Sequence, residues 1–516
     1  MNGAEALVRT LVGAGVDVCF ANPGTSEMHF VAALDRVEGM RCVLCLAEGS
    51  VTGAADGYAR MADKPASTLL HLGPGLANGL TNLHNAGRGY TPMVNIVGDH
   101  ATYHHAYDAP LTSDIEAVAR PFSHWVRMGT SAASVAADAA DAIAAARNPP
   151  GQIATLILPA DVAWSEAPGG AAPPRALAVP EPVDADAIRR AAAILRSGEP
   201  AALLMTGRAL RAANLDNAGR IAAATGARLL SQTSNARVER GAGRVAVDRV
   251  PYPVDIALKF LAGLKHVILV GAKAPVAFFA YPEKPSVLTP ADCEIFCLAR
   301  PGQDLGAALA ALADELGAAR APVPAEALRR SAPPRDGPIT PETLAAALCA
   351  RLPENAIVVD ESISVGRAFY GTLRGAPPHD WLQLTGGAIG DGLPMATGAA
   401  IACPERPVLC LEGDGSAMYN VQSLWTQARE NLNVTTLIMN NRSYVILRGE
   451  LANVGAQNVG PKAIDMLSLD RPDIDWVPLA RAMGVEGFRA TTIAELNLAL
   501  EAGLASRGPA LIDVVL

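Results

Sequence analysis

The residues with the clearest capacity for chemistry are Asp414 and Asn441. Asp414 follows an apolar run over 408–411, and Asn441 follows a second apolar run over 434–439. Runs of this length are typical of buried parallel strands, and ligands bind beyond the carboxyl ends of such strands. A carboxylate and an amide oxygen that meet there suit a hard cation such as Mg²⁺, which usually holds phosphate oxygens as well. The sequence therefore predicts a metal and phosphate site in this stretch.

Alternating helical and strand patterns place this stretch in the last of three blocks. Residues 1–165, 186–318 and 342–516 each show the pattern, and two linkers rich in proline separate them. Strands that alternate with helices predict parallel sheets covered by helices on both faces. We therefore expect an α/β fold made of three doubly wound domains with mainly parallel sheets.

Two glycine-rich segments are expected to form turns at strand ends. One lies between a strand expected over 66–71 and a helix expected over 75–86. The other, Gly413–Ser416, precedes a helix expected over 421–431. Its glycines would let a diphosphate approach the helix N-terminus.

Composition and charge narrow the class of protein. The net charge of −9 at pH 7 argues against a nucleic-acid-binding surface. The N-terminus lacks a signal-peptide layout, and no apolar run reaches the ~18 residues of a membrane span. We therefore expect a cytoplasmic protein with no membrane and no nucleic-acid partner.

Cys42 and Cys45 are spaced like a redox or metal pair. In a strand, however, their side chains would point to opposite faces, so we expect both to be buried thiols.

The motifs and their spacing match a known family. GDGS at Gly413, followed by the asparagine pair that ends at Asn441, resembles the pattern of thiamine-diphosphate (ThDP) enzymes. FANPGTSEMHF, LAEGSVTGAADGYAR and HLGPGLANGLTNLHNA resemble the pyrimidine-binding domain of these enzymes, and GGAIGDGLPMATGAA at Gly386 resembles the segment beneath the cofactor. The similarity is greatest to the acetolactate synthase and benzoylformate decarboxylase branch, and within it to short acetolactate-synthase-like proteins of actinobacteria. It implies pyrimidine-binding, central and diphosphate-binding domains, in that order.

The resemblance assigns roles to residues of the first block. Glu48 would hydrogen-bond the cofactor's aminopyrimidine ring and make it basic, and burial would favour the protonated carboxyl that donates this bond. Its alternative role is to cap the following helix. His71 and Thr25 match a histidine and a serine of the benzoylformate decarboxylase active site, where His71 would shuttle protons unless it is purely structural. Asn22 and Pro23 belong to the same cofactor-binding segment.

The resemblance also assigns roles in the third block. Asp414, Asn441 and an oxygen of Ser443, expected to be its backbone carbonyl, would bind Mg²⁺. Ile389 matches the apolar residue that holds the cofactor in its bent shape, and its alternative role is plain core packing. The remaining implied contacts to the cofactor are Ser364, Gly387, Gly415, Ser416 and Tyr444.

The substrate pocket is less well defined by the resemblance. His104 and His105 invite comparison with the paired histidines of pyruvate decarboxylases, although the flanking residues differ. Benzoylformate decarboxylase has a second active-site histidine in its central domain, and the matching stretch 275–281, PVAFFAY, has none. Phe278 or Phe279 would line the pocket instead. The central block contains no recognisable flavin motif, so FAD is not expected.

The implied function is a ThDP- and Mg²⁺-dependent reaction on a 2-keto acid. Loss of CO₂ would be followed by ligation to a second carbonyl compound, as in acetolactate synthases, or by protonation, as in benzoylformate decarboxylases. Members of the family build each active site between two subunits, so we expect a homodimer or a homotetramer. A non-catalytic regulatory relative is disfavoured by Glu48 and the complete metal motif. An NAD-dependent dehydrogenase is disfavoured because the glycines over 73–79 lack the GxGxxG spacing.

Overall fold

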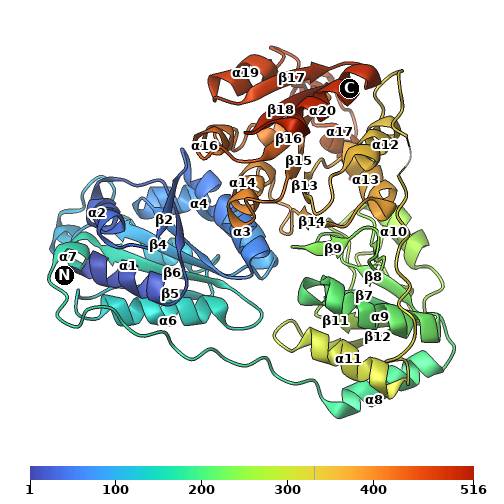
Figure 1. Cartoon of the computed structure of the whole chain (residues 1–516), viewed down its shortest axis with the longest axis horizontal. Helices are drawn as coiled ribbons and strands as arrows, with labels where there is room; N and C mark the ends of the chain where they lie inside the picture. Colours follow the sequence, from blue (N-terminus) through green and yellow to red (C-terminus); the bar gives the residue numbers. More distant parts are fainter. Residues whose placement is uncertain (331) are drawn as a thin grey trace.

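The computed structural model describes residues 1–330 and 332–516 and contains three β-sheets (Figure 1). All strand pairs of the first sheet are parallel. Its strands, in spatial order, are β2 (Arg41–Leu44), β1 (Val18–Ala21), β3 (Ala66–Leu70), β4 (Met93–Asp99), β6 (Ile153–Pro159) and β5 (Trp125–Met128).

Helices cover both faces of the first sheet and bury a separate apolar cluster on each. One face carries α1 (Gly3–Gly13), α2 (Met28–Arg36), α6 (Val135–Arg147) and α7 (Ala160–Trp164). The other face carries α3 (Glu48–Ala62), α4 (Leu72–Arg88) and α5 (Ile115–Ala119).

The second sheet, in the green and yellow part of Figure 1, is also parallel. Its strands, in spatial order, are β10 (Asp248–Arg249), β8 (Arg228–Ser231), β7 (Ala201–Met205), β11 (His266–Val270) and β12 (Glu294–Ala299). The accompanying helices are α8 (Ala185–Arg196), α9 (Ala212–Thr225), α10 (Val254–Leu261) and α11 (Leu305–Glu315).

The third sheet is parallel except at one edge, where β9 pairs antiparallel with β14. Its strands, in spatial order, are β17 (Glu486–Ala490), β18 (Ala510–Val515), β16 (Val434–Asn440), β15 (Val408–Gly413), β13 (Ile357–Glu361), β14 (His379–Gln383) and β9 (Val238–Arg240). Its helices are α12 (Pro341–Arg351), α13 (Phe369–Thr372), α14 (Gly392–Ala402), α15 (Asp414–Ala417), α16 (Ser423–Arg429), α17 (Val445–Asn453), α18 (Pro461–Asp465), α19 (Trp476–Ala482) and α20 (Ile493–Ala505). Across residues 1–330 and 332–516, no helix is both long and apolar enough to cross a membrane.

These sheets confirm the expected α/β fold with mainly parallel sheets. The proposed domain ranges 1–165, 186–318 and 342–516 each contain one sheet, but β9 leaves the second range to extend the third sheet. A three-residue strand of this kind has too little sequence pattern to predict its partner.

Both segments expected to be glycine-rich turns are helical, and these predictions are wrong. Helix α4 begins at Leu72, so its first turn contains Gly73 and Gly75, and α15 begins at Asp414. Glycine weakens a helix by about 1 kcal/mol relative to alanine, but that cost is outweighed where a neighbour approaches too closely for any side chain. The expectation for the cysteines is only partly right, because Cys45 is buried and Cys42 is exposed.

Close contact between α3 and α14 joins the first and third sheets. Both helices lie between the two sheets in Figure 1, and their apolar residues share one cluster. A Cβ on Gly57 would lie 2.0 Å from the backbone oxygen of Met395, and a Cβ on Gly398 would lie 1.8 Å from that of Ala54. Because backbone lies against backbone at both places, a larger residue would push the helices apart.

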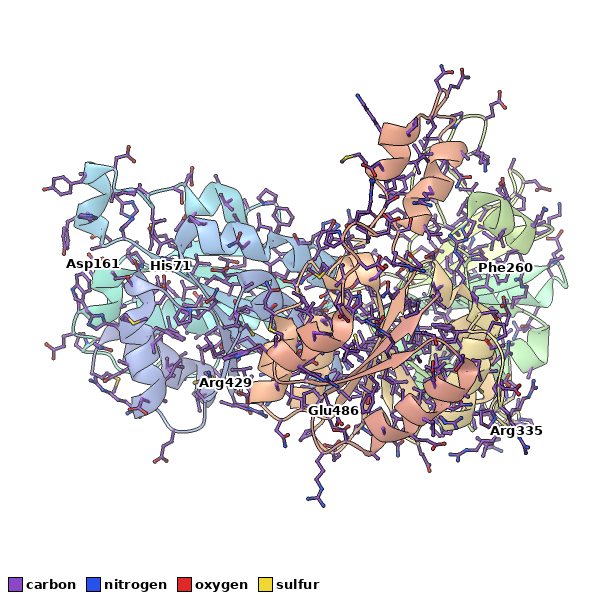
Figure 2. The ribbon with its side chains drawn as sticks, turned by 90° about the horizontal axis from the view of Figure 1, so that it is seen from above. His71, Asp161, Phe260, Arg335, Arg429 and Glu486 are labelled. Atoms are coloured by element: carbon purple, nitrogen blue, oxygen red, sulfur yellow. The ribbon has the colours of Figure 1, made fainter. Side chains whose placement is uncertain are left out.

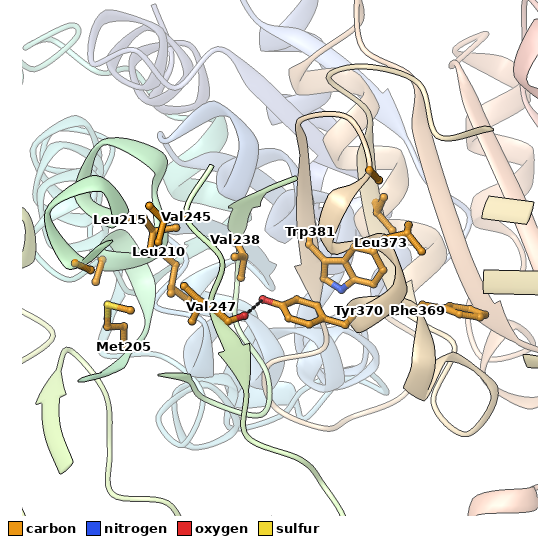
Figure 3. Packing of buried hydrophobic residues seen from close by; sticks show 14 of the residues in the cluster. Met205, Leu210, Leu215, Val238, Val245, Val247, Phe369, Tyr370, Leu373 and Trp381 are labelled. Atoms are coloured by element: carbon orange, nitrogen blue, oxygen red, sulfur yellow. Dashed lines mark hydrogen bonds between the residues drawn. The ribbon is translucent and has the colours of Figure 1, made fainter. Parts of the chain in front are cut away.

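A second apolar cluster joins the central part of the chain to the other face of the third sheet. Figure 3 shows Val238 and Val247 opposite Tyr370 and Trp381, and the last two rings pack edge to face with centroids 5.7 Å apart. The Tyr370 hydroxyl donates a hydrogen bond to the backbone oxygen of Val247 at 3.4 Å. The third sheet is therefore packed against a different part of the chain on each face.

Arg60, near the end of α3, connects all three parts of the chain. Its guanidinium is buried and forms a two-pronged ion pair with Asp56, with Nε–Oδ1 and Nη2–Oδ2 distances of 2.8 and 2.6 Å. Nη1 also donates to the backbone oxygens of Ala236, at 3.2 Å, and Gln383, at 2.7 Å. Ala236 lies just before β9 and Gln383 ends β14, so one cation holds the three proposed domains in place.

Replacing Arg60 with methionine should destabilise the fold by roughly 3–5 kcal/mol, because Asp56 would become a buried charge without a partner. Denaturant unfolding followed by circular dichroism measures the loss. The matched control is Arg189→Met, since Arg189 pairs with Asp186 on the surface and should contribute less than about 1 kcal/mol. Equal losses in the two variants would contradict this role for Arg60.

Candidate active site

Polar side chains line one edge of the first sheet. Strands β2, β1, β3 and β4 are neighbours and parallel, so their carboxyl ends lie at the same edge. The residues at or just beyond these ends are, in the same order, Glu48, the segment Asn22–Glu27, His71 and Asp99. The topology therefore brings the three residues predicted to be catalytic, Glu48, His71 and Thr25, to one edge.

Glu48 is the first residue of α3 and is only 7% exposed. Its Oε2 accepts a hydrogen bond from Asn78 Nδ2 at 3.1 Å. A Cβ on Gly75 would lie 2.8 Å from Oε1, so glycine at that position leaves the space that the carboxyl occupies. A carboxyl that makes a single side-chain hydrogen bond within the described chain has capacity left for a ligand.

His71 lies next to Glu48, in the N-terminal part of the molecule labelled in Figure 2. Gly75 separates the two residues, because a Cβ there would also lie 3.3 Å from the Cβ of His71. The Nδ1 atom of His71 is 2.7 Å from Oε2 of Glu27, a residue that the sequence analysis missed. The available signal was a carboxylate in the segment that follows the first strand, two residues after Thr25.

The other residues predicted to lie at this edge, Thr25, Asn22 and Pro23, belong to the segment Asn22–Glu27 that contains Glu27. Thr25 is exposed and begins a 3-10 helix over Thr25–Glu27. Asn22 and Pro23 are half-buried directly after β1, where the Asn22 N–H donates to the backbone oxygen of Leu69 at 3.1 Å. The segment passes beside His71, because a Cβ on Gly24 would lie 2.1 Å from Nδ1 of that ring.

Asp414 and Asn441 lie at the carboxyl ends of the adjacent parallel strands β15 and β16. Asp414 is 3% exposed, and its Oδ2 accepts a hydrogen bond from the N–H of Arg442 at 2.6 Å. This bond places the carboxylate against the turn that contains Asn441. The structure thus brings these two residues together.

Ser443 completes the predicted ligand set in the same turn. Its N–H donates to Oδ1 of Asn441 at 3.1 Å, and its hydroxyl donates to the backbone oxygen of Leu467 at 2.9 Å. Because the hydroxyl is already engaged, the backbone carbonyl of Ser443 is the better candidate for a ligand.

The oxygen atoms of Asp414, Asn441 and Ser443 have the chemistry that Mg²⁺ prefers. The set contains one carboxylate, and no cluster of three His, Cys, Asp or Glu side chains suited to a metal occurs among residues 1–330 and 332–516. Burial raises the pKa of Asp414, while hydrogen bonds from backbone N–H groups oppose the shift. A cation bound there would favour the ionised carboxylate.

Gly415, Ser416 and Tyr444, three of the other residues predicted to contact the cofactor, lie beside Asp414. Ser416 is 3% exposed and donates to the backbone oxygen of Gly413 at 3.2 Å. The ring of Tyr444 lies over Gly415, since a Cβ there would be 2.4 Å from Cε1 of the ring. Ser364 is half-buried immediately before a 3-10 helix over Val365–Ala368.

The segment before α14 contains Gly387 and Ile389. Gly387 is exposed but lies under the ring of Phe278, because a Cβ there would be 2.3 Å from Cζ. Ile389 is half-buried and therefore is not an ordinary core residue. Asn420 donates to the backbone oxygen of Gly390 at 2.6 Å and also lies against Gly49, which links this segment to the start of α3.

Glu361, at the end of β13, is a second residue that the sequence analysis missed. Its carboxyl is 2% exposed and accepts hydrogen bonds from the N–H groups of Gly390, Asp391 and Gly392 at 2.6, 2.9 and 2.5 Å. Burial raises its pKa from 4.5 to about 7, although the three hydrogen bonds oppose the shift. Glu361 therefore holds the turn that leads into α14. Its position two residues after the apolar run 356–359 was the signal for a strand-end carboxylate.

The four residues considered for a substrate pocket are not brought together. Phe278 lines a cavity of about 1010 Å³ with His84, Thr206, Lys273, Thr385 and Gly386. Phe279 contacts Phe278 edge to face but does not line this cavity, and neither do His104 and His105. His105 instead approaches Asp99, with an Nε2–Oδ2 distance of 3.2 Å, and His104 is exposed.

The arrangement contains two half-sites with complementary chemistry. The first has a buried carboxyl beside a histidine, which can bind a heteroaromatic ring and move protons. The second has an oxygen ligand set beside a helix start, which can hold a cation with phosphate groups. Within one chain, Glu48 and Asp414 share no hydrogen-bond partner, so no hydrogen bond of theirs links the two half-sites directly.

Comparison with known proteins shows that the segments containing the two half-sites match thiamine pyrophosphate binding domains. The model "Thiamine pyrophosphate enzyme, N-terminal TPP binding domain" matches residues 1–118, and the corresponding C-terminal model matches residues 366–514. The chain is 57% identical to "Putative acetolactate synthase large subunit IlvX" of Mycobacterium tuberculosis, over 100% of this chain and 99% of that protein. It is 31% identical to benzoylformate decarboxylase of Pseudomonas aeruginosa, over 97% and 96% of the two chains. The solved structure of a ThDP-dependent 4-hydroxybenzoylformate decarboxylase from Rhodococcus jostii RHA1 has a TM-score of 0.85, with 26% identity over 99% and 98% of the chains.

Glu361 predicts a specific dependence of stability on pH. Because its folded-state pKa lies above its unfolded value, the folded protein binds the extra proton between about pH 4.5 and 7 and loses stability as pH rises through that window. One such group contributes a slope of at most about 1.4 kcal/mol per pH unit.

Melting temperatures of the wild type and Glu361→Gln, measured from pH 5 to 8, test this point. Glutamine cannot ionise, so we expect the variant to lose less of its melting temperature as pH rises. Parallel curves for the two proteins would show that Glu361 does not carry the extra proton.

Proposed function

Because this chain belongs to the thiamine pyrophosphate enzyme family, we propose that it is a ThDP- and Mg²⁺-dependent enzyme that decarboxylates a 2-keto acid and ligates the product to a second carbonyl compound. One observation carries the proposal. The two half-sites, Glu48 and the Asp414–Asn441 pair, fall within the two segments that match the family models.

In this proposal the diphosphate end of ThDP binds at β15 and β16. Asp414, Asn441 and the backbone carbonyl of Ser443 hold Mg²⁺, and Ser416 lies where it can contact a phosphate. Ser364, Gly387, Gly415 and Tyr444 supply further contacts, and Ile389 supports the cofactor from the segment before α14.

The aminopyrimidine end belongs to the first sheet. The buried Glu48 carboxyl hydrogen-bonds the ring, and Asn22 and Pro23 lie along the same edge. When bound, ThDP supplies the nucleophile that attacks the keto group and the electron sink for loss of CO₂. His71, beside Glu48, exchanges protons with the substrate, and Thr25 offers a hydroxyl to it.

Decarboxylation without ligation, as in benzoylformate decarboxylases, is the second candidate. The relative from P. aeruginosa and the R. jostii structure support it, because both carry decarboxylase names over nearly the whole chain. The absence of a histidine in 275–281 departs from the benzoylformate decarboxylase pattern and therefore favours ligation.

We further propose a homodimer or homotetramer in which Glu48 of one chain faces Asp414 of another. Helices α17 and α18, which follow Ser443, contain no buried residue. They carry the exposed apolar side chains Val445, Leu447 and Ile464, and the exposed Met466 directly follows α18. Apolar surface beside a half-site supports coverage by a second copy.

Glu48→Gln should lower turnover by at least roughly 10²-fold, because the amide cannot make the aminopyrimidine ring basic. It should still bind ThDP, since Asp414 and Asn441 are intact. Mass spectrometry of products from pyruvate, 2-ketobutyrate and benzoylformate measures turnover and also distinguishes ligation from simple decarboxylation. Glu38→Gln, at an exposed position of the same domain, is the control.

Unlike Glu48→Gln, Asp414→Ala should lose the binding of ThDP itself. We expect it to lose the rise in melting temperature that ThDP with Mg²⁺ gives to the wild type, because a metal ligand is missing. Near-normal turnover in Glu48→Gln, or an unchanged ThDP effect in Asp414→Ala, would refute the proposed site.

A further inference from the structure

The Glu27–His71 pair has the structure of a carboxylate–imidazole dyad. Oε2 of Glu27 lies 2.7 Å from Nδ1 of His71 and also accepts the Gly24 N–H at 2.7 Å. The Glu27 side chain is fully buried, whereas 26% of the His71 side chain is exposed. The buried partner therefore fixes one ring nitrogen, and the imidazole remains accessible.

The surrounding backbone is shaped to hold this pair. A Cβ on Gly98 would lie 1.6 Å from Oε1 of Glu27, and a Cβ on Gly24 would lie 2.1 Å from Nδ1 of His71. Glycines on two different strand ends thus provide the space for the two side chains. Oε1 of Glu27 has no hydrogen-bond partner among the described residues, so the bonds that Oε2 makes with His71 and the Gly24 N–H are what compensates the burial of this carboxyl.

We propose that Glu27 is the positioning residue for His71. It holds Nδ1 in the protonated form and orients the ring, so that Nε2 exchanges the proton with the substrate. This inference rests on the proposed 2-keto acid chemistry. In each turnover Nε2 donates one proton to the substrate and regains one from solvent, while Glu27 stays ionised and never contacts substrate.

The charged neighbours of His71 agree with this assignment. Glu48 on α3 lies across Gly75, and Asp99 on the adjacent strand end pairs with His105. Burial raises the pKa of Glu27, but the hydrogen bond and charge of His71 act in the opposite direction. The hydrogen bond to His71 therefore offsets part of the cost of burying Glu27, and it holds the imidazole in one orientation.

The test compares the wild type with Glu27→Gln and Glu27→Asp as full-length enzymes loaded with ThDP and Mg²⁺. The rate of carbethoxylation of His71 by diethyl pyrocarbonate, followed peptide by peptide, reports its pKa without requiring turnover. We expect the midpoint to fall by roughly one to three pH units in Glu27→Gln and by less in Glu27→Asp. His124, exposed and distant in sequence, is the internal reference and should not shift.

Kinetics provide the second measurement. Glu27→Gln should reduce kcat about 10–100-fold and shift the pH profile of kcat/KM, and it should cause no further loss in a His71→Ala background. An unchanged His71 midpoint, or additive losses in the double variant, would overturn the proposal.

The two readouts separate the possible failures. If no 2-keto acid is turned over but the midpoint shifts, the dyad stands and the proposed function fails. If turnover is found and the midpoint does not shift, the function stands and the dyad fails. If the melting temperature falls sharply in Glu27→Gln but not in Glu27→Asp, the glutamine variant is destabilised. The His71 midpoint and the kcat of Glu27→Asp then test the dyad.

Discussion

The close contact of α3 with α14 is the constraint on which the rest of the structure depends. Helix α3 begins at Glu48, and α14 begins after the turn that Glu361 holds. Because the backbones meet at Gly57 and Gly398, the two helices have little freedom to slide or separate. Arg60 fixes the far end of α3 to the other parts of the chain. The first and third sheets of one chain are therefore held in a fixed relation, which sets where each chain presents its two half-sites.

The parallel sheets place the functional carboxyl groups at strand ends, and burial then determines how readily these groups exchange protons. Glu48, Glu27, Glu361 and Asp414 all lie at or just beyond the carboxyl ends of parallel strands and are nearly inaccessible to water. Glu48 accepts a hydrogen bond from an amide side chain and Glu27 pairs with an imidazole, whereas Glu361 and Asp414 accept hydrogen bonds from backbone N–H groups. A buried carboxyl with an imperfect set of partners is costly to keep and readily exchanges protons. Such costs are typical of functional sites.

Motifs with local sequence patterns were predictable, and long-range contacts were not. The apolar runs before Asp414 and Asn441 predicted parallel strands and a shared edge, and the structure brings those residues together. The turns expected at Gly73 and Gly413 are helices, because packing against neighbours outweighs the weak helical preference of glycine. Arg60 and β9 were missed because their partners lie more than a hundred residues away in the sequence. Glu27 and Glu361 were accessible to the same strand-end reasoning that identified Asp414.

The most direct test of the central claim is complementation between two inactive variants. Glu48→Gln and Asp414→Ala chains, carrying different affinity tags, are co-expressed, and the mixed oligomer is purified through both tags and assayed with saturating ThDP and Mg²⁺. If Glu48 of one chain acts with Asp414 of another, each mixed dimer regains one intact site of two, and activity returns to roughly half of the wild-type value. Mixed oligomers that remain as inactive as the parent variants would contradict the claim.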